Sequence, residues 1–415
     1  MKISYERPFV AELEKRLSEE QPLIQVLVGP RQVGKTTGMR QLLGRYSHNN
    51  HHYANADDLL VTDRTWLLEQ WQKALMLGEG TLLIIDEVQK IPNWSETLKS
   101  LWDRNPRRLR VVVLGSSSLQ IQTGLSESLA GRFELTRIYH WTFTELKDAF
   151  GYDLERFLLY GGYPGSVSYE EEYDRWYAYL KDSIVEAVIG KDILLNRKVG
   201  NPALFRQAFE ILCRYPAQEI SYTKLLGQLQ DKGNTDLIKY YIELYAGAFL
   251  IYPLEKYSSK GWLMRSSSPK ILISCPALYT MTQGPRVLDD PDRRGRVFEL
   301  AVGAQLLQMP GELFYWREKN AEVDFIYHYQ GMVYAIEVKS GRRRFAKGLE
   351  AFMKRFPDAC PVILTIDDFP LFSADPNKFL AVIRAVSSPH NPINQRTASS
   401  GQLNSGTVDS GTVEQ

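Results

Sequence analysis

The sequence has few cysteines, almost no net charge and no long apolar run, and each shortage excludes a class of protein. Its 415 residues include three cysteines, Cys213, Cys275 and Cys360, whose wide spacing fits neither a disulfide framework nor a zinc site. We therefore expect a reducing compartment. No apolar run has the length of a transmembrane helix, and residues 1–17 lack the apolar segment of a signal peptide. These absences predict a cytoplasmic protein with no membrane partner.

The formal net charge is +1, so the composition as a whole gives no argument for a nucleic-acid partner. Such an argument depends on local clusters of basic residues. These clusters are Arg293, Arg294 and Arg296, and then Arg342, Arg343, Arg344 and Lys347. They could follow a nucleic-acid backbone, or they could form an ordinary solvated surface. The chain is too long for one hydrophobic core, so we expect two or three domains.

A P-loop motif lies near the amino terminus and organises the first domain. An apolar run that predicts a buried parallel strand, Leu23 to Val28, precedes it, and a helical stretch, Thr37 to Leu43, follows. In such a loop the backbone N–H groups surround phosphate oxygens, Lys35 reaches the β- and γ-phosphates, and the Thr36 hydroxyl binds Mg²⁺. The predicted ATP-binding residues are Gly29, Pro30, Arg31, Gln32, Val33, Gly34, Lys35, Thr36 and Thr37.

Two carboxylates, Asp86 and Glu87, follow a second apolar run, Thr81 to Ile85. The carboxyl ends of strands in open α/β sheets are where ligands bind. We therefore predict that Asp86 holds the Mg²⁺ shell and that Glu87 orients and deprotonates the attacking water.

Two further residues are candidates for contact with the γ-phosphate. Ser116 follows the buried strand Arg110 to Gly115 and could act as a polar sensor, although a helix N-cap explains it equally well. Arg132 lies in a loop and could reach the nucleotide of its own or of a neighbouring subunit, which would require self-association through the ATPase domain.

Three histidines, His48, His51 and His52, stand beside Asn49 and Asn50. No carboxylate or cysteine completes a metal-ligand set there, so we interpret the stretch as a solvated polar loop.

The regular alternation of strands and helices ends near Gly151. Residues 171–195 predict a helix whose apolar stripe is Trp176, Leu180, Ile184 and Val188. Three helices and a closing strand within residues 201–258 then suggest a winged-helix pattern. The third helix has only one lysine, Lys239, so we favour a protein-packing module over a DNA reader.

The last folded part has a helix near Arg296 to Gln308 and three strands with period-two alternation. The strands are Phe314–Arg317, Glu322–Tyr327 and Tyr334–Ser340, with a hairpin turn at Gln330 and Gly331. Alternation places Glu337 and Lys339 on one face, with Asp324 beside them across the hairpin. With Glu299 these carboxylates could bind Mg²⁺ or Mn²⁺, with Lys339 assisting a nucleophile. Cross-strand ion pairs, such as Lys339 with Glu322, are the alternative.

Taken together, these motifs resemble a family of bacterial and archaeal AAA-type P-loop ATPases that carry a C-terminal domain of unknown function. The resemblance rests on Gly-Pro-Arg-Gln-Val-Gly-Lys-Thr-Thr, Ile-Ile-Asp-Glu, Gly-Ser-Ser-Ser, Ala-Gly-Arg, Gly-Gly-Tyr-Pro, Glu-Val-Asp-Phe and Ile-Glu-Val-Lys-Ser-Gly. It implies ATP hydrolysis, a winged-helix middle and a restriction-endonuclease-like C-terminus. Glu299, Asp324, Glu337 and Lys339 match its PD-(D/E)xK pattern, but no proline precedes the aspartate.

The predicted fold is α/β: a P-loop parallel sheet, a winged-helix-like region and a restriction-endonuclease-like domain. The predicted divisions are an amphipathic helix (1–20), the ATPase (21–150), a helical connector (151–200), a winged-helix-like domain (201–258), a nuclease-like domain (259–386) and a disordered tail (387–415). We expect an ATPase that controls a C-terminal domain acting on duplex or branched DNA. The alternative is an ATP-driven switch whose inactive nuclease-like domain binds a protein or RNA.

Overall fold

The computed structural model describes residues 5–46, 50–57, 63–115, 121, 129–195, 197–229, 234–258, 268–341 and 347–387. The chain divides into two compact units, Met1–Gln308 and Met309–Gln415, and each is described here by itself. Within the described residues, none of the helices combines the length and apolar character that a membrane crossing requires.

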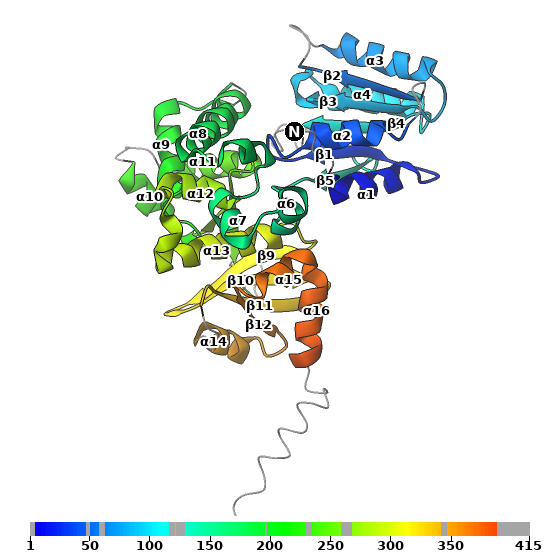
Figure 1. Ribbon diagram of the computed structural model, residues 1–415. Coiled ribbons are helices and arrows are strands. Elements are labelled where there is room, and N and C mark those ends of the chain that lie inside the picture. The colour runs from blue at the N-terminus through cyan, green and yellow to red at the C-terminus, as the bar shows by residue number, and fades with distance from the viewer. Residues whose placement is uncertain are drawn as a thin grey trace, which may run out of the picture. The chain divides into compact units, whose positions relative to one another are not determined.

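The first unit begins with a five-stranded sheet in the order β2-β3-β4-β1-β5, in which every pair of neighbours is parallel (Figure 1). The strands are β1 (Ile24–Val28), β2 (His51–Asn55), β3 (Leu82–Asp86), β4 (Arg110–Gly115) and β5 (Phe133–Arg137). β1 and β3 are buried along their whole length, as expected for strands of a parallel sheet covered on both faces. The predicted parallel-sheet P-loop fold is confirmed.

Helices cover this sheet because alternate strand residues point to opposite faces. The helices are α1 (Pro8–Leu17), α2 (Lys35–Leu43), α3 (Arg64–Met76) and α4 (Trp94–Arg104), with a 3₁₀ turn, η1, at Val88–Lys90. One core joins Val26, Ile85 and Val113 of the strands to Trp71 of α3 and Leu98 of α4. α1 packs on α2, burying Val10, Leu13 and Leu17 of α1, whereas Phe9 stays partly exposed.

The histidine-rich stretch is not the loop that its composition predicts. His51 and His52 begin β2, which pairs with β3 from His51 opposite Leu82 to Asn55 opposite Asp86. The His52 Nε2 atom lies 2.9 Å from Oε1 of Gln70 on α3. His48 falls outside the described residues. Strand pairing overrides the polar composition here, because a central strand needs a neighbour for its backbone hydrogen bonds.

The rest of the first unit is mostly helical. Its elements are α6 (Phe143–Phe150), α7 (Leu154–Tyr160), η2 (Pro164–Tyr169), α8 (Tyr173–Ala178), η3 (Tyr179–Val185), η4 (Val188–Leu194), α9 (Pro202–Leu212), β6 (Gln218–Glu219), α10 (Tyr222–Gln228), α11 (Thr235–Gly247), β7 (Ile251–Lys256), β8 (Lys270–Ile273), α12 (Pro276–Gln283), η6 (Val287–Asp289) and α13 (Pro291–Leu306). The predicted stripe Trp176, Leu180, Ile184 and Val188 is buried. The stretch 171–195, predicted to be helical, consists of α8 followed by two π-helical segments, η3 and η4.

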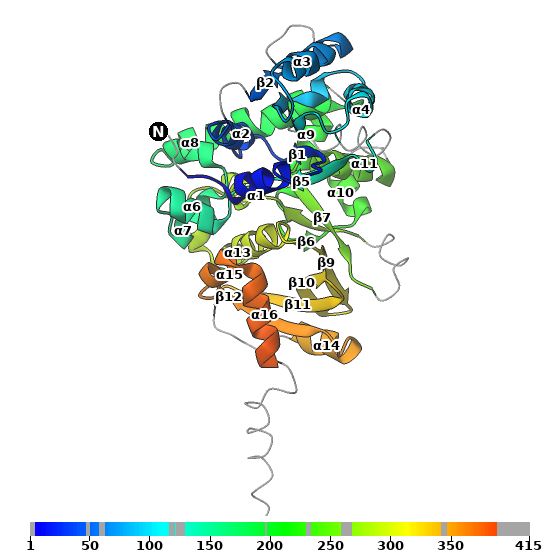
Figure 2. The ribbon, with the colours of Figure 1, turned by 90° about the vertical axis from the view of Figure 1, so that its right-hand side faces the viewer.

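Among its described residues, 309–341 and 347–387, the second unit has four strands ordered β12-β11-β10-β9 and three helices (Figure 2). Its elements are β9 (Glu312–Glu318), β10 (Ala321–Tyr329), β11 (Met332–Lys339), α14 (Lys347–Arg355), β12 (Cys360–Thr365), α15 (Phe369–Ala374) and α16 (Pro376–Ser387). β9, β10 and β11 are antiparallel neighbours, and β12 runs parallel to β11. Gln330 and Gly331 form the predicted hairpin turn, both with positive φ.

Candidate active site

The loop between β1 and α2 has the geometry of an anion cradle. Gly34 adopts a φ of 91° and caps α2 without a side chain, so the first N–H groups of the helix keep no side-chain acceptor at that cap. Gly29 is required for a different reason. A Cβ atom at Gly29 would lie 2.1 Å from the carbonyl oxygen of Ile138, which follows β5. The glycine spacing thus serves both the loop and its packing.

The Lys35 ammonium lies inside this loop. Its Nζ donates to the carbonyl oxygens of Gly29 and Pro30, both at 2.7 Å, and the residue is 8% exposed. Burial lowers the pKa of Lys35 to about 8, while the nearby carboxylates of Glu87 and Asp86 act in the opposite direction. The lysine is therefore held where the phosphates of a P-loop ligand bind.

Thr36 and Asp86 come together at the carboxyl end of β3. The Thr36 hydroxyl donates to Asp86 Oδ2 at 2.9 Å, and the Tyr53 hydroxyl donates to the same oxygen at 2.7 Å. The other carboxylate oxygen accepts from the Glu87 N–H at 2.9 Å. The hydroxyl and the carboxylate are hard oxygen donors of the kind that Mg²⁺ prefers, so the residues present fit that ion.

Glu87 follows Asp86 in a left-handed conformation, with φ 54° and ψ 40°. Non-glycine residues held there are strained by about 1–3 kcal/mol and cluster at functional sites. Burial raises the pKa of Glu87, and the Gln89 amide, which donates to its Oε2 at 2.5 Å, opposes that shift.

The amino-terminal segment and the start of α6 fix the loop from the other side. The carbonyl oxygen of Val33 accepts from Nη1 of Arg7 at 3.1 Å and from Nε1 of Trp141 at 2.9 Å. Arg7 in turn makes a buried bidentate ion pair with Glu145 of α6, at 2.7 and 3.0 Å. These contacts hold the phosphate loop rigidly although their residues are far apart in the chain.

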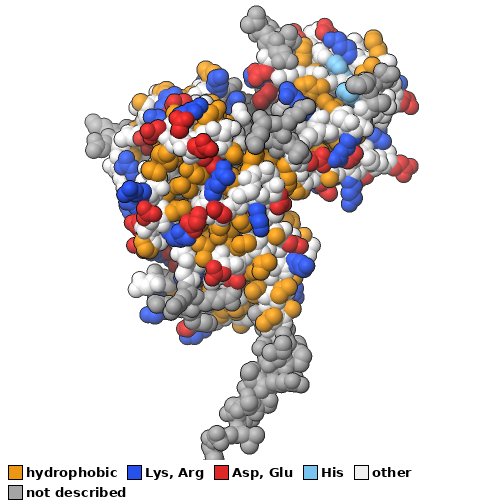
Figure 3. Space-filling view, viewed as in Figure 1, with side chains coloured by type: hydrophobic (Ala, Val, Ile, Leu, Met, Phe, Trp, Pro, Cys, Tyr) orange, Lys and Arg blue, Asp and Glu red, His pale blue; other side chains and the backbone are white. Residues whose placement is uncertain are grey.

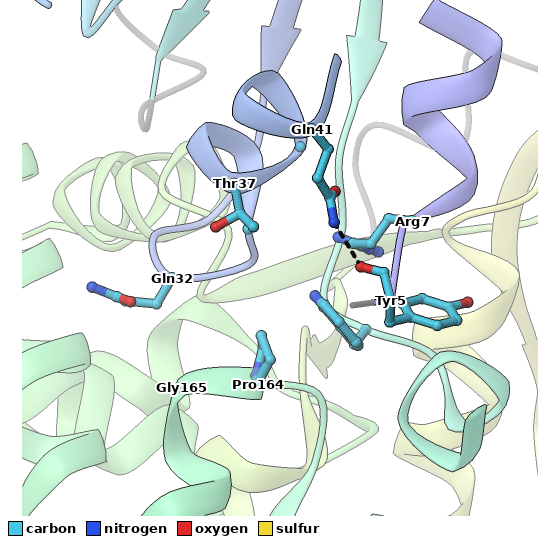
Figure 4. A pocket seen from close by; sticks show the side chains of 10 residues that line it. Tyr5, Arg7, Gln32, Thr37, Gln41, Pro164 and Gly165 are labelled. Atoms are coloured by element: carbon cyan, nitrogen blue, oxygen red, sulfur yellow. Dashed lines mark hydrogen bonds between the residues drawn. The ribbon is translucent and has the colours of Figure 1, made fainter. Parts of the chain in front are cut away.

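A cavity of about 160 Å³ opens beside this loop (Figure 4). Gln32 and Thr37 line it from the loop and α2, Tyr5 and Trp141 line it on another side, and Pro164 on a further one. The two ring centroids are 5.4 Å apart. Gln41 donates to the Tyr5 carbonyl oxygen at 2.9 Å, which fixes the amino-terminal segment against α2.

Arg31, another loop residue, points to the helical part of the same unit. Its guanidinium makes two hydrogen bonds with the Asp192 carboxylate of η4, at 2.6 and 2.5 Å.

Arg132 does not reach this site. Its carbonyl oxygen accepts from Ile24 N–H at 3.0 Å, so it lies beside the first residue of β1, whereas the phosphate loop follows the last. At about 3.3 Å per residue, β1 separates the two positions by about 13 Å. The Arg132 guanidinium pairs instead with Asp103 of α4, at 2.7 Å. Ser116, the other predicted sensor, lies outside the described residues.

The C-terminal candidates divide between the two units. On the β10–β11 hairpin, Asp324 Oδ2 accepts from the Val338 N–H at 2.8 Å, and Lys339 pairs with Glu337 at 2.6 Å. β10 has a bulge between Val323 and Ile326. The alternative partner of Lys339, Glu322, lies 3.9 Å from Arg317.

The three carboxylates predicted to bind a metal come from both units: Glu299 belongs to the first, and Asp324 and Glu337 belong to the second. Glu299 pairs with the buried Lys270 of β8 at 2.7 Å. Among the residues described, no group of three or more His, Cys, Asp or Glu side chains is placed to hold a metal ion.

The sequence motifs do not point to four residues that contact the loop or Asp86: Tyr53, Arg7, Trp141 and Asp192. Tyr53 had one available signal, because the helix after a P-loop is normally followed by another strand before the next helix. Tyr53 lies on that strand, β2. The other three contact the loop over long sequence separations and leave no local pattern.

Residues 21–147 match the family described as AAA domain. This part of the chain is thus similar to AAA domains, in agreement with its parallel sheet and P-loop. Residues 151–284 and 294–381, which follow the AAA domain, match two domains of unknown function, DUF8612 and DUF4143.

The relatives that match most of this chain are uncharacterized proteins. One, from Mycobacterium tuberculosis, is 28% identical over 340 residues, which cover 80% of this chain and 74% of the relative. Another, from Methanocaldococcus jannaschii, is 25% identical, covering 73% of this chain and 71% of the relative. A solved structure, the Walker-type ATPase PABY2304 of Pyrococcus abyssi, is similar with a TM-score of 0.49 and 15% identity, covering 68% of this chain and 96% of that one.

Proposed function

We propose that this protein binds ATP together with Mg²⁺ and hydrolyses it to ADP and phosphate. One observation carries the proposal: the Thr36 hydroxyl and the Asp86 carboxylate meet at 2.9 Å, beside a lysine buried in the phosphate loop. If Lys35 had only a structural role, its ammonium group would be expected to pair with a carboxylate. Instead it donates to two loop carbonyl oxygens, which are weaker partners than a carboxylate and can be replaced by a phosphate.

Each residue has a defined task in this reaction. Lys35 and the N–H groups at the start of α2 bind the β- and γ-phosphates, while Thr36 and Asp86 would hold Mg²⁺. When bound, the ion neutralises charge that builds up on the phosphate oxygens. Glu87 orients water in line with the γ-phosphorus and accepts its proton. Its raised pKa suits this role, because a general base works best near the ambient pH.

The cavity beside the loop receives the nucleoside. Its lining includes Thr37 at the start of α2, which continues the phosphate site, and the aromatic residues Tyr5 and Trp141 add apolar surface for a purine. Pro164 lines the cavity from the helical region, so a bound base contacts that region as well as the P-loop.

Mg²⁺-dependent phosphate release from ATP tests the proposal. Lys35→Ala should abolish nucleotide binding, whereas Glu87→Gln should keep binding and lower the turnover by about 10²–10⁴-fold. Matched controls are Lys73→Ala on the exposed surface of α3 and Glu96→Gln on α4, which should behave as wild type. Unchanged rates in both site variants would refute ATP hydrolysis at this loop.

Arg132 and Ser116 stay predictions. Arg132 lies beside the first residue of β1, at the end of the strand away from the phosphate loop. Its action on a nucleotide would therefore require a second copy of the chain. Analytical ultracentrifugation with and without nucleotide tests such self-association.

For the middle of the chain, the order α9, β6, α10, α11, β7, β8 supports a winged-helix-like module. We favour protein packing over DNA reading, because α11 buries Tyr241 and Tyr245 and its one lysine, Lys239, is paired with Asp236. On the face shown in Figure 3, the described Lys and Arg side chains intermingle with Asp and Glu and form no continuous basic stripe.

A restriction-endonuclease-like C-terminal domain with metal-dependent cleavage is a second proposal. It is supported by Asp324, Glu337 and Lys339 on neighbouring positions of one hairpin next to a bulge. The alternative remains an inactive domain that binds a protein or RNA partner. Wild type and Asp324→Ala should be compared on duplex, single-stranded and branched DNA with Mg²⁺ or Mn²⁺. Glu350→Gln, on the exposed side of α14, is the control. Equal inertness of wild type and Asp324→Ala would eliminate cleavage.

A further inference from the structure

Gln89, in the turn η1 that follows β3, contacts the proposed general base directly. Its side-chain Nε2 donates to Oε2 of Glu87 at 2.5 Å. On a regular helix, side chains two residues apart do not face each other. Glu87 has a left-handed backbone, with φ 54° and ψ 40°, which departs from helical geometry and allows this contact. The strained conformation of Glu87 thus brings its carboxylate and the Gln89 amide together.

The backbone on both sides of Gln89 is fixed by burial. Val88 and Ile91 belong to the core of the parallel sheet and are 0% and 1% exposed. Two backbone hydrogen bonds close the turn: the Lys90 N–H donates to the Glu87 carbonyl oxygen at 3.0 Å, and the Ile91 N–H donates to that of Val88 at 3.1 Å. Gln89 therefore extends from a rigid base, as a side chain that orients another group must do.

The end of β4 leaves room for the Gln89 side chain. Gly115 is the last residue of β4, and a Cβ atom there would lie 2.4 Å from Oε1 of Gln89 and 2.2 Å from Cδ1 of Ile121. Packed carbon atoms keep about 3.5–4.0 Å, so a larger residue at this position would displace the amide. The glycine at the end of β4 is thus matched to the amide that contacts Glu87.

The charges around Glu87 explain why a neutral donor suits this position. Burial raises the pKa of Glu87, while the Gln89 hydrogen bond, and then the charges of Lys35 and Arg31, act in the opposite direction. A carboxylate drawn onto either cation would occupy a group that the phosphates need, and it would be a weaker base. Because an amide is neutral, it holds the carboxylate with a smaller loss of basicity than a further cation would cause.

We propose that Gln89 is a positioning residue for ATP hydrolysis: its amide, packed against Gly115, holds the Glu87 carboxylate in the orientation that accepts a proton from the attacking water. This inference rests on the proposed hydrolysis of ATP at the same loop. Gln89 acts through Glu87, since an amide side chain takes up no proton near neutral pH.

Steady-state hydrolysis of ATP with Mg²⁺ by the full chain tests this role. Gln89→Met keeps the length and approximate volume of the side chain and removes the donor. Its kcat should fall by about 10–100-fold with KM unchanged, because a misplaced base slows the chemical step without altering nucleotide binding. The matched control is Gln72→Met on the exposed surface of α3, which should behave as wild type. A kcat of Gln89→Met within about twofold of wild type, or above it, would overturn the proposal.

The pH profile separates positioning from a purely structural role. Because the Gln89 hydrogen bond lowers the pKa of Glu87, its removal should move the acidic limb of the kcat profile to higher pH. A loss of stability alone would not move that limb. In the Glu87→Gln background, Gln89→Met should have no further effect on kcat, because no base remains to be positioned. An unmoved limb, or a fully additive loss in the double variant, would also overturn the proposal.

Gly115→Ala tests the same contact from β4. The added methyl group should displace the Gln89 amide and lower kcat with KM unchanged. Combined with Gln89→Met, it should lower kcat by less than about twofold further, because the amide that it displaces is already absent. If Gln89→Met does not fold, as judged by circular dichroism, the kcat and pH profile of Gly115→Ala decide in the same way.

Failure of the positioning role and failure of the proposed function give different results. If wild type releases no phosphate from ATP, or if Glu87→Gln turns over as fast as wild type, the proposed function fails and the positioning role fails with it. If Glu87→Gln is slow but folded Gln89→Met keeps the kcat and the pH profile of wild type, the positioning role alone fails.

Discussion

Replacing Arg7 by methionine should destabilise the first unit and loosen the phosphate loop. The Arg7 guanidinium makes four hydrogen bonds: two to the Glu145 carboxylate at 2.7 and 3.0 Å, and one each to the carbonyl oxygens of Val33 and Tyr139 at 3.1 and 3.0 Å. Both partners of the ion pair are buried, with side chains 8% exposed. Methionine keeps most of the apolar stem and removes all four bonds.

The expected loss is large because one charged partner is left behind. Breaking a buried ion pair by removing one member costs about 3–5 kcal/mol, since the remaining charge is neither hydrated nor paired. Against a total stability of about 5–15 kcal/mol, this is a substantial fraction. Glu145→Gln should cost less, because the neutral amide can still accept from Arg7. The double variant Arg7→Met/Glu145→Gln should therefore be less damaging than the sum of the single changes.

Urea denaturation followed by far-UV circular dichroism measures this, with calorimetric titration of ATP as a second readout. Glu12→Gln on α1, which breaks the exposed 3.2 Å pair with Arg16, is the control and should cost about 0.5 kcal/mol or less. If Arg7→Met unfolds at the same urea concentration as Glu12→Gln, the Arg7 clamp does not stabilise the fold and the reasoning is wrong.

Two further predictions concern pH. Because burial lowers the pKa of Lys35 to about 8, the ATP affinity measured by calorimetry should be constant below that pH and fall about tenfold per pH unit above it. The Lys35→Arg variant, whose guanidinium is always charged, should show no such fall. A constant wild-type affinity up to about pH 9.5 would contradict this. Burial also lowers the pKa of His140 to about 3 from 6.5, so the folded state stays neutral while the unfolded chain takes up a proton. Stability should be unaffected above pH 6.5 and decline by up to about 1.4 kcal/mol per unit below it, and His140→Gln should lack this part of the slope in urea denaturation. Identical slopes in the two proteins would refute the assignment.

The sequence alone determined the features that depend on neighbouring residues. The glycines around Lys35, the apolar runs that became β1, β3 and β4, and the turn at Gln330 and Gly331 are set by backbone conformation and by local burial, which short patterns record. Thr36 and Asp86, which the sequence predicts as Mg²⁺ ligands, lie within hydrogen-bond distance of each other. Their strands are read as parallel, and parallel strands end at the same sheet edge.

Local patterns miss strand pairing and charge partners that lie in distant segments. The composition around His51 and His52 predicts a loop, but these residues pair with β3 as a strand. Lys270, which pairs with Glu299, left no local signal in the sequence. The local sequence cannot identify such partners, because many lysines and many strands in the chain could pair with a given carboxylate or strand.

Tertiary structure alone decided how the phosphate loop is held. Arg7, Trp141 and Asp192 reach Val33 and Arg31 from segments that are near in space and remote in sequence. Hydrogen bonds and ion pairs require atoms within about 3 Å, and only the folded chain brings those atoms together. Residue types and spacing thus specified the chemistry of the loop, and packing specified which side chains hold it in place.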